Sequence, residues 1–278
     1  FTVFFLLPIL GGVGISLTNW TVSRPSITRF VGLKNYITMF QDDDILLAFK
    51  NTAIFTVAIV ILRNLFAILL ALALVKKLYT RTYLRTIFYI PAVLSYVVVG
   101  IMFTAMFQMN GTFNQILNAF GIPCTKEWLA SGDTALLMVI VEDVWKWTGF
   151  HMIIYIAGLQ AIPTDLYEAA KIDGANRFQR IVHINLPAIV PIATISFILS
   201  VGNLMSVGFE KIYLMQSDLN LPRTEVIATY VYKRTFGAKG FKPYSYGAAV
   251  GLFNTFINLV LLFFANYVSK KVGGETVI

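Results

Sequence analysis

Four charged residues stand inside the long apolar stretches of this 278-residue chain. Arg63 lies near the middle of one stretch. Glu142, Asp143 and Lys146 lie close together in another. Each would cost about 2.5–3.5 kcal/mol on an insertion scale if its side chain met lipid, so all four are expected to face the interior of a helix bundle. Their formal charges sum to zero, which favours ion pairs over isolated charges.

Helix geometry selects the partners within this group. Glu142 and Lys146 are separated by one helical turn, in the favourable order for an ion pair. At a rise of about 1.5 Å per residue, Arg63 and Asp143 both lie about 12–16 Å below the same membrane surface, so Asp143 is the expected partner of Arg63. The pair could hold two helices in register or contact a polar substrate, because buried ion pairs often contribute specificity alone.

Small polar residues form a second group, with the chemistry to bind a ligand. In the stretch 187–209 they recur at helical spacing and share one helix face: Ser196, Ser200, Asn203 and Ser206. Asn254 and Asn258 repeat this pattern in the stretch 246–268. Such groups can bind sugar hydroxyls, although joining membrane helices is their commoner use. Three aromatic residues that could stack on sugar rings, or anchor helices at the membrane interface, are Trp145, Trp147 and Tyr96.

A polar segment, "YEAAKIDGANRFQRIVHINLPAIVP" at residues 167–191, interrupts the apolar pattern. Asp165 and Glu168 suit the first turn of a short helix, where carboxylates complement the helix dipole. Gly174 suits a left-handed C-cap, and Asn176 can cap a second short helix. The segment is therefore predicted to form two short helices joined by a tight turn.

The surface of this predicted helix pair carries little side-chain volume. Ala169, Ala170 and Gly174 would let the groove of another protein close tightly over them. A helix that rests on lipid headgroups would instead carry large apolar residues on one face and Lys or Arg on the other. The mixture of small, acidic and single basic residues at 166–175 favours docking to a protein.

The elements that must position these residues are membrane helices. Hydrophobic residues make up 57% of the chain and charged residues 13%, with a mean hydropathy of +0.73, which excludes an ordinary soluble domain. Six apolar stretches are long enough to cross the hydrocarbon core as helices. They are 1–17, 52–75, 86–109, 135–159, 187–209 and 246–268. The first has no basic stretch before it and no small-residue cleavage site after it, so a signal peptide is the weaker interpretation.

Charge in the loops predicts the orientation of these helices. The short segment between the second and third stretches carries basic residues and no acid: Lys76, Lys77, Arg81 and Arg85. Short positive loops stay in the cytoplasm, and Lys270 and Lys271 after the last stretch agree, so both termini are expected in the cytoplasm. The loop 210–245 is also basic and would lie outside, but long loops cross the membrane largely regardless of charge.

The segment "EAAKIDGANRFQRIVHINLP" resembles the EAA loop of binding-protein-dependent ABC importer permeases, because every position of the pattern Glu-Ala-Ala, Asp-Gly-Ala and Ile-x-Leu-Pro is filled. The similarity continues in "GLKNY", "NTAIFTV", "YIPAVLS", "VWKWTGFHMIIYIAGL" and "YSYGAAVGLFNTFINL". Together these segments resemble the MalF-like first permease of carbohydrate importers, and "SVGNLMSVGFEKIYLM" and "TYVYKRTFG" resemble its oligosaccharide-handling branch. The chain has no G-x-x-x-x-G-K-[ST] sequence, so a separate subunit must bind ATP.

This resemblance implies an all-α protein of the bacterial inner membrane, with six visible transmembrane helices and the type I ABC importer permease fold. It implies one transmembrane domain over residues 1–278, with core helices at about 52–268, the EAA loop at 160–187 and an extracellular loop at 210–245. The chain would catalyse no reaction and hold no metal or cofactor; ATP and Mg²⁺ would bind to two cytoplasmic ATPase subunits. Its other partners would be a second homologous permease, a solute-binding protein and an oligosaccharide substrate.

The resemblance also assigns roles to residues by position. The EAA loop would dock in a cleft of the ATPase and transmit its closure to the membrane helices. Its docking surface would consist of Glu168, Ala169, Ala170, Asp173 and Gly174, with Asp165, Leu166 and Arg177 at the margin. The residues that we expect to bind substrate are Ser200, Asn203, Ser206, Asn254, Asn258 and Trp145.

The loop 210–245 is too long for a simple turn between helices. We expect a helix near 224–235. Tyr230 and Tyr232, or Lys233 and Arg234, would be available there to the solute-binding protein and its sugar. The net positive charge of the loop leaves room for an acidic oligosaccharide, although the same charge could steer an acidic protein surface.

Three other functions are compatible with a polytopic membrane protein. A permease for amino acids or phosphate would share the mechanism, and only the oligosaccharide-type segments argue against it. A secondary transporter would show internal repeats and helices broken at matching positions, and neither is visible in the sequence. A scaffold protein without transport would show no substrate-stimulated ATP hydrolysis when purified with its partners.

Overall fold

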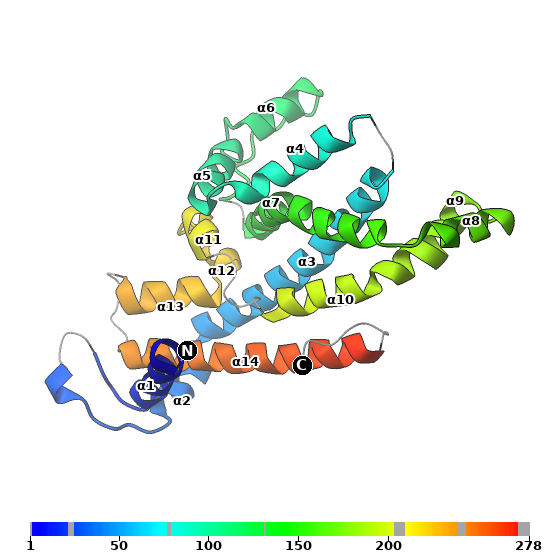
Figure 1. The fold of residues 1–278 in the computed structure, drawn as a ribbon. Coiled ribbons are helices and arrows are strands. Elements are labelled where there is room, and N and C mark those ends of the chain that lie inside the picture. Colours follow the sequence, from blue (N-terminus) through cyan, green and yellow to red (C-terminus); the bar gives the residue numbers. More distant parts are fainter. Residues whose placement is uncertain are drawn as a thin grey trace. The chain divides into compact units, whose positions relative to one another are not determined.

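The structure is a computed structural model that describes residues 2–21, 25–76, 79–130, 132–202, 209–237 and 243–271. Helices account for all the regular elements of these residues, and a single antiparallel bridge joins Thr18 to Phe30 (Figure 1). The predicted all-α class is therefore confirmed.

The helices follow one another along the chain with short connections. In order, they are η1 (Thr2–Leu6), α1 (Leu7–Ser16), η2 (Pro25–Ile27), α2 (Lys34–Phe40), α3 (Asp43–Leu74), α4 (Arg81–Val93), α5 (Tyr96–Met106), α6 (Thr112–Ala119), α7 (Gly132–Gln160), α8 (Thr164–Ile172), α9 (Arg177–Arg180), η3 (Ile181–Asn185), α10 (Leu186–Gly202), α11 (Phe209–Met215), α12 (Leu221–Thr224), α13 (Ile227–Phe236) and α14 (Tyr244–Lys271).

Three helical segments of the described chain are long and apolar enough to cross a membrane without a break: α3, the run Arg177–Ile198 that ends in α10, and α14. The helix over the first predicted stretch, Thr2–Ser16, is apolar but shorter. α7 has 29 residues, which is ample length for a span. Its three closely spaced charges, Glu142, Asp143 and Lys146, lower its apolar character.

The predicted stretch 86–109 is not one uninterrupted helix. α4 and α5 meet at a bend of 100°. Pro91 weakens the end of α4 because it has no N–H to donate, and Leu94 after it is extended (φ −68°, ψ 144°). The Ser95 Oγ accepts a hydrogen bond of 3.3 Å from the Val97 N–H, which caps the new helix.

The chain divides into two compact units, and the division falls within long helices. The first unit consists of Phe1–Thr56, Gly100–Leu136 and Leu204–Val260. The second unit consists of Val57–Val99, Leu137–Asn203 and Leu261–Ile278.

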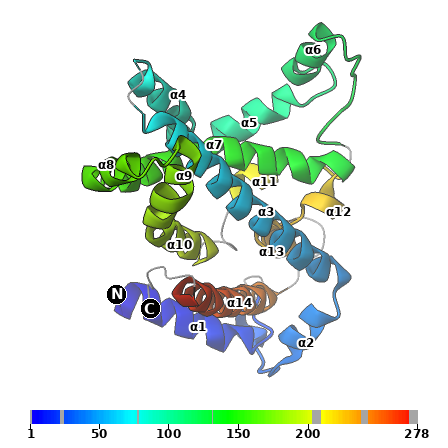
Figure 2. The ribbon, with the colours of Figure 1, turned by 90° about the vertical axis from the view of Figure 1, so that its right-hand side faces the viewer.

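The core of the second unit lies between α3, α7 and α10. Small residues on α3, large ones on α7 and Ile189 of α10 form one buried cluster: Ala67, Ala71, Leu74, Met152, Tyr155, Ile156, Leu159 and Ile189. Glycine allows a still closer approach between α7 and α4, because a Cβ atom at Gly149 would lie 1.8 Å from the Phe88 carbonyl oxygen. Figure 2 shows α8 and α9 beside the end of α10 that they precede.

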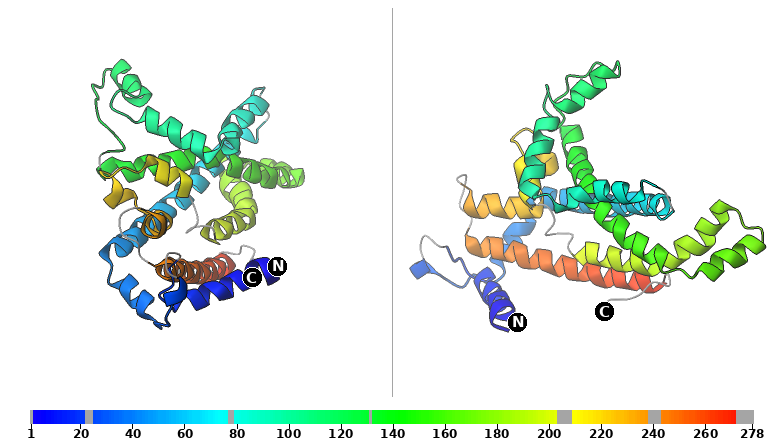
Figure 3. Two further views of the ribbon diagram at one scale, coloured as in Figure 1. Left: turned by 90° about the vertical axis from the view of Figure 1, so that its left-hand side faces the viewer. Right: turned by 45° about the horizontal axis from the view of Figure 1, so that its top comes forward.

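The core of the first unit is formed by the beginning of α3 with α11, α13 and the beginning of α14. Ile45, Phe55, Ile212, Ile227 and Tyr246 are all at most 2% exposed. α13 runs beside the first half of α14 (Figure 3), and a Cβ atom at Gly247 of α14 would lie 2.6 Å from the Thr235 Oγ1 of α13.

Candidate functional site

The polar segment 160–187 forms the predicted pair of short helices. α8 ends at Ile172, and Gly174 has the left-handed backbone (φ +78°) that favours glycine. The Ala175 N–H then donates to the Ala170 carbonyl over 2.8 Å, which closes the end of α8. The predictions for Gly174 and for the helix end are confirmed.

Asn176 starts the second helix of the pair, as its residue type predicted. Its Oδ1 accepts from the Gln179 N–H over 2.9 Å, and the Gln179 Oε1 accepts from the Asn176 N–H over 2.7 Å. This reciprocal capping box fixes α9 by local contacts alone. The contribution of Gln179 was not anticipated, although its position three residues after Asn176 is the usual signal for it.

The outer surface of the α8–α9 pair is uncovered. Neither helix contains a buried residue. Of the predicted docking residues, Ala170 is partly buried and the other seven are exposed: Asp165, Leu166, Glu168, Ala169, Asp173, Gly174 and Arg177. Two large apolar side chains beside them, Ile172 and Phe178, are 87% and 73% exposed. Such an apolar surface within a charged segment is typical of a protein contact.

Attachment of this pair to the rest of the second unit is also local. The Tyr167 hydroxyl donates to the Asn185 Oδ1 over 3.1 Å, and this contact ties α8 to η3. Burial raises the pKa of Tyr167, so its hydroxyl keeps its proton. This hydrogen bond therefore joins α8 to the residue that directly precedes α10.

Within the second unit, the structure brings Arg63 to Asp143. An Arg63 Nη lies 3.8 Å from the Asp143 Oδ1, and the other Nη donates to the Ser200 Oγ over 2.7 Å. All three side chains are buried. Arg63 thus joins α3, α7 and α10, and Ser200 in turn donates to the Ser196 carbonyl over 2.7 Å. This geometry favours helix packing for Ser200 over an open ligand contact.

Lys146 is held at the break between α4 and α5. Its Nζ donates to the Pro91 carbonyl over 3.0 Å and to the Leu94 carbonyl, and it lies 4.8 Å from the centroid of the Tyr96 ring. The neighbouring Trp147 donates its Nε1–H to the Tyr96 hydroxyl over 2.9 Å. Lys146 therefore satisfies carbonyls that the helix break releases. Glu142, on the same helix, is fully buried.

The structure describes three of the remaining predicted substrate residues and leaves two outside the described residues. Asn203 and Ser206 lie outside the described residues. Asn254 and Asn258 of α14 are partly buried, and the Oδ1 of each is enclosed without a hydrogen bond to any described residue. Trp145 is 41% exposed. Among the described residues, no group of three or more His, Cys, Asp or Glu side chains could hold a metal ion.

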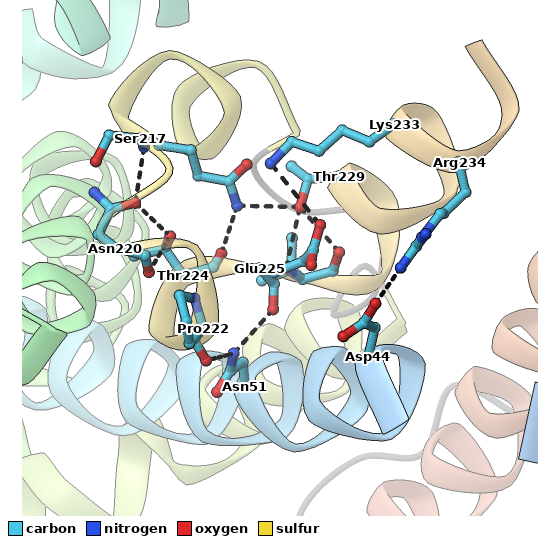
Figure 4. Close-up of polar contacts among 12 residues, drawn as sticks. Asp44, Asn51, Ser217, Asn220, Pro222, Thr224, Glu225, Thr229, Lys233 and Arg234 are labelled. Atoms are coloured by element: carbon cyan, nitrogen blue, oxygen red, sulfur yellow. Dashed lines mark hydrogen bonds and ion pairs between the residues drawn. The ribbon is translucent and has the colours of Figure 1, made fainter. Parts of the chain in front are cut away.

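A polar network in the first unit fastens the segment 216–237 to the beginning of α3 (Figure 4). The Asn51 Nδ2 donates to the carbonyls of Pro222 and Glu225 over 3.0 and 3.1 Å. The Thr52 Oγ1 accepts from the Ile227 N–H over 3.1 Å, at the start of α13. The predicted helix near 224–235 is thus confirmed as α13, and the network orients it.

Asn220 organises the turn that precedes α12. Its Nδ2 donates to the carbonyls of Leu129 and Met215 over 2.7 and 3.0 Å, and its Oδ1 accepts from the Ser217 N–H over 2.9 Å. Asn220 is fully buried. This residue was missed in the sequence, although an asparagine before Leu-Pro is a typical helix start.

Two ion pairs hold the far end of α13. Arg234 pairs with Asp44 of α3, and the Lys233 Nζ lies 3.8 Å from the Glu225 Oε1 (Figure 4). Burial raises the pKa of Glu225 and lowers the pKa of Lys233, while each charge partly offsets the shift of the other. Both basic residues that were expected to face a binding protein are thus engaged within the chain.

Tyr230 is not on the outer surface, and the expectation that a partner could reach it was wrong. It is 1% exposed, and its hydroxyl donates to the Asp42 Oδ2 over 2.6 Å and lies 3.0 Å from the Tyr246 hydroxyl. Burial raises its pKa, so the phenol stays protonated. Tyr232, on the other face of α13, is 38% exposed.

Comparison with known proteins identifies this arrangement. Residues 63–274 match the family described as "Binding-protein-dependent transport system inner membrane component". The polygalacturonan/rhamnogalacturonan transport system permease protein YteP of Bacillus subtilis is 34% identical over 256 residues, which are 89% of this chain and 77% of that protein. The trehalose/maltose transport system permease protein MalF of Thermococcus litoralis is 33% identical over 272 residues, which are 98% of this chain and 88% of that protein.

A solved structure extends the likeness to the fold. One chain of a bacterial alginate ABC transporter, crystallised in complex with an alginate pentasaccharide-bound periplasmic protein, is similar to this chain with a TM-score of 0.87. The two are 29% identical, and the match covers 100% of this chain and 92% of the other. The chain therefore has the type I importer permease fold, and it belongs to the family of binding-protein-dependent transport system inner membrane components.

Proposed function

We propose that this chain is one permease subunit of an ATP-driven, binding-protein-dependent importer of oligosaccharides. It would form half of the path across the bacterial inner membrane, and a second homologous permease would form the other half. The uncovered α8–α9 pair, with its complete EAA pattern, is the observation that carries this proposal. A segment that is shaped by its own caps and exposed on its outer surface is ready to be bound without rearrangement.

The α8–α9 pair would dock on a cytoplasmic ATPase subunit. Seven of its eight candidate residues are exposed, and the small ones among them leave room for a closely fitting groove. Two ATPase subunits, one for each permease, would bind ATP and Mg²⁺, and this chain would perform no covalent chemistry. Because α8 is tied to the start of α10 through Tyr167 and Asn185, closure of the ATPase would move α10 as a body.

The orientation follows from the basic loops. The segment 76–85 would lie in the cytoplasm together with the α8–α9 pair and both termini, and α13 would lie outside. Six spans would then be η1 with α1, α3, the bent pair α4 and α5, α7, the run through α10, and α14. The charged α7 is compatible with a span because its charges are buried within the bundle.

Sugars are favoured as cargo by the relatives, whose names refer to trehalose and maltose, galacturonan polymers and alginate. Asn254 and Asn258 stay in the candidate set, because the Oδ1 of each has no hydrogen-bond partner among the described residues. Asn203, Ser206 and Trp145 stay in the candidate set. Ser200 is better explained by its bond to Arg63. A permease for amino acids or phosphate is the alternative, and it would reject sugars.

Reconstitution with the partner permease, both ATPases and the binding protein tests this proposal. We expect ATP hydrolysis that is stimulated by an oligosaccharide-loaded binding protein, and loss of that stimulation in Gly174→Val. Gly121→Val is the matched control, because Gly121 has the same left-handed backbone (φ +80°) and equally open surroundings but lies after α6. Equal stimulation in Gly174→Val and Gly121→Val would remove α8–α9 from the coupling surface.

A further inference from the structure

A continuous row of aromatic rings lies on the first unit, and only one of its members, Tyr232, is among the candidate residues described above. Its members, which we call the aromatic row, are Phe209 and Tyr213 of α11, Tyr232 and Phe236 of α13, and Tyr244 of α14. Neighbouring ring centroids in the row lie between 4.9 and 5.5 Å apart. Trp20 extends the row, with its ring 5.7 Å from that of Tyr244.

The row lies on the surface because α13 has two different faces. Thr229 and Tyr230 are buried. Tyr232 and Phe236 are one helical turn apart on another face, where they are 38% and 59% exposed. Tyr213 of α11 is 42% exposed beside them. A hydrophobic core does not explain rings that keep this much contact with the surroundings.

Membrane anchoring does not explain the row either. Aromatic anchors sit at the ends of membrane-spanning helices, and Tyr244 at the start of α14 fits that description. The other four rings lie on α11 and α13, which have 7 and 10 residues and are too short to span. Lys233 and Arg234 beside the row would suit lipid headgroups, but both are paired within the chain, Lys233 with Glu225 and Arg234 with Asp44. Isolated anchors have no need of ring-to-ring contact, which here continues through all five residues.

The part of the row on α13 is held in place before any ligand arrives. Asn51, Thr52 and Asp44 of α3 bind both ends of the segment that contains α13. Rings fixed in advance lose little conformational freedom on binding, since Tyr and Phe have only two side-chain torsions.

We propose that the aromatic row is a stacking track for the pyranose rings of an incoming oligosaccharide. This inference rests on the proposed function, which supplies a sugar as cargo and places α13 outside the membrane. A pyranose has an apolar face of C–H groups that covers an aromatic ring, while its hydroxyls remain in water or bond to the Tyr232 and Tyr213 phenols. Several adjacent rings suit a chain of sugars better than a single one.

Stacking, and not charge, is the interaction that the row offers. The two basic side chains beside it are already paired, Lys233 with Glu225 and Arg234 with Asp44. These pairs leave neither Lys233 nor Arg234 unpaired to select an acidic glycan beside the row. Neutral and acidic oligosaccharides of equal length should bind to the row with similar affinity.

Binding to the purified permease complex without its solute-binding protein tests the proposal. The probes are two ladders of increasing chain length, one of neutral gluco-oligosaccharides and one of acidic oligogalacturonates, and saturation-transfer NMR reports the Kd. For the longer members we expect the double variant Tyr232→Ala/Phe236→Ala to weaken binding about tenfold, as for the loss of two ring contacts. Disaccharide binding should not change, and Tyr232→Phe should bind like the wild type.

Phe120→Ala is the matched control, because Phe120 is 80% exposed, belongs to the same unit and lies outside the row. Equal weakening in this control, or a loss that is independent of chain length, would overturn the proposal. Failure of the double variant to copurify with the second permease would also overturn it and make the row a subunit interface. If the wild-type importer transports no oligosaccharide, the proposed function itself fails; if it does and the row variants bind normally, only the row is refuted.

Discussion

A buried lysine needs hydrogen-bond acceptors, and Lys146 of α7 finds them in the backbone at the break between α4 and α5. Helical hydrogen bonding is interrupted at the break near Leu94, and the ammonium group of Lys146 on α7 donates to two carbonyls there, those of Pro91 and Leu94. Arg63 is placed differently, since it has a carboxylate and a hydroxyl as partners. The two cations thus have separate structural roles, although both appear in the sequence simply as charges in apolar helices.

At the scale of single residues, Arg63→Ala is expected to destabilise the complex by about 3–5 kcal/mol, because Asp143 would keep its buried charge without this partner. Arg63→Ala combined with Asp143→Ala should be milder than Arg63→Ala alone. Denaturant unfolding of the purified complex in detergent measures the free energy of unfolding of the single and the double variant. Ser200→Ala should cost about 1 kcal/mol through the lost hydrogen bond. A double variant that is no more stable than the worse single variant would contradict direct pairing.

At the scale of elements, the close approach of α7 to α4 depends on a single glycine, Gly149. No side chain fits at residue 149, because its Cβ would collide with the backbone oxygen of Phe88, and a backbone atom cannot swing aside as a side chain can. The same approach brings Lys146 to the end of α4. The contact between α7 and α4 that Gly149 allows is therefore the same contact that lets Lys146 donate to the carbonyls of Pro91 and Leu94.

Gly149→Ala is expected to separate α4 from α7 and to lower the melting temperature of the complex. Gly251→Ala is the control, since Gly251 lies within α14 and a Cβ there meets no atom within 4 Å. An alanine at such a helical position should be neutral or stabilising by about 0.5–1 kcal/mol. Equal melting temperatures for the two variants would show that the crossing tolerates a methyl group.

The attachment of α13 should depend on pH through Glu225. Its pKa is raised in the folded protein, mainly by burial, so the folded state binds the proton more tightly than the unfolded state. The stability that protonation of Glu225 contributes is therefore fully present below the pKa of Glu225 in the unfolded chain. It is lost as the pH rises through the pKa of Glu225 in the folded protein. Hydrogen-exchange protection of α13, corrected for intrinsic rates, should increase from neutral to mildly acidic pH. Glu225→Gln should remove this increase; an unchanged pH profile in that variant would assign it to another group.

At the scale of the whole molecule, chemical labelling of the chain's own cysteine tests the proposed orientation in the membrane. Cys124 is the only cysteine and lies in the α6–α7 connection, which is predicted to face outward. A membrane-impermeant maleimide should label it in intact cells. In a Cys124→Ser background, Asp173→Cys should be labelled only in inverted vesicles, because α8 would face the cytoplasm. Labelling of both sites from the same side would reject the orientation.

Local chemistry made several features of this protein readable from its sequence alone. Apolar stretches predict membrane helices, and the caps at Gly174 and Asn176 depend on neighbours within a few residues, so α8 and α9 were predictable. The match in depth between Arg63 and Asp143 follows from the constant rise of a helix. The resemblance of the EAA segment to importer permeases needed no tertiary information either.

Tertiary structure decided whatever depends on which helix lies alongside. Two tyrosines of α13, Tyr230 and Tyr232, look equivalent in the sequence, yet one is buried against Asp42 and the other is part of an exposed aromatic row. Lys233 and Arg234 became paired only because the segment 216–237 packs on the beginning of α3. Likewise, the helix break after α4 lies where Lys146 of the neighbouring α7 donates to the Pro91 and Leu94 carbonyls. The direction of a side chain is set by long-range packing, which no local pattern in the sequence encodes.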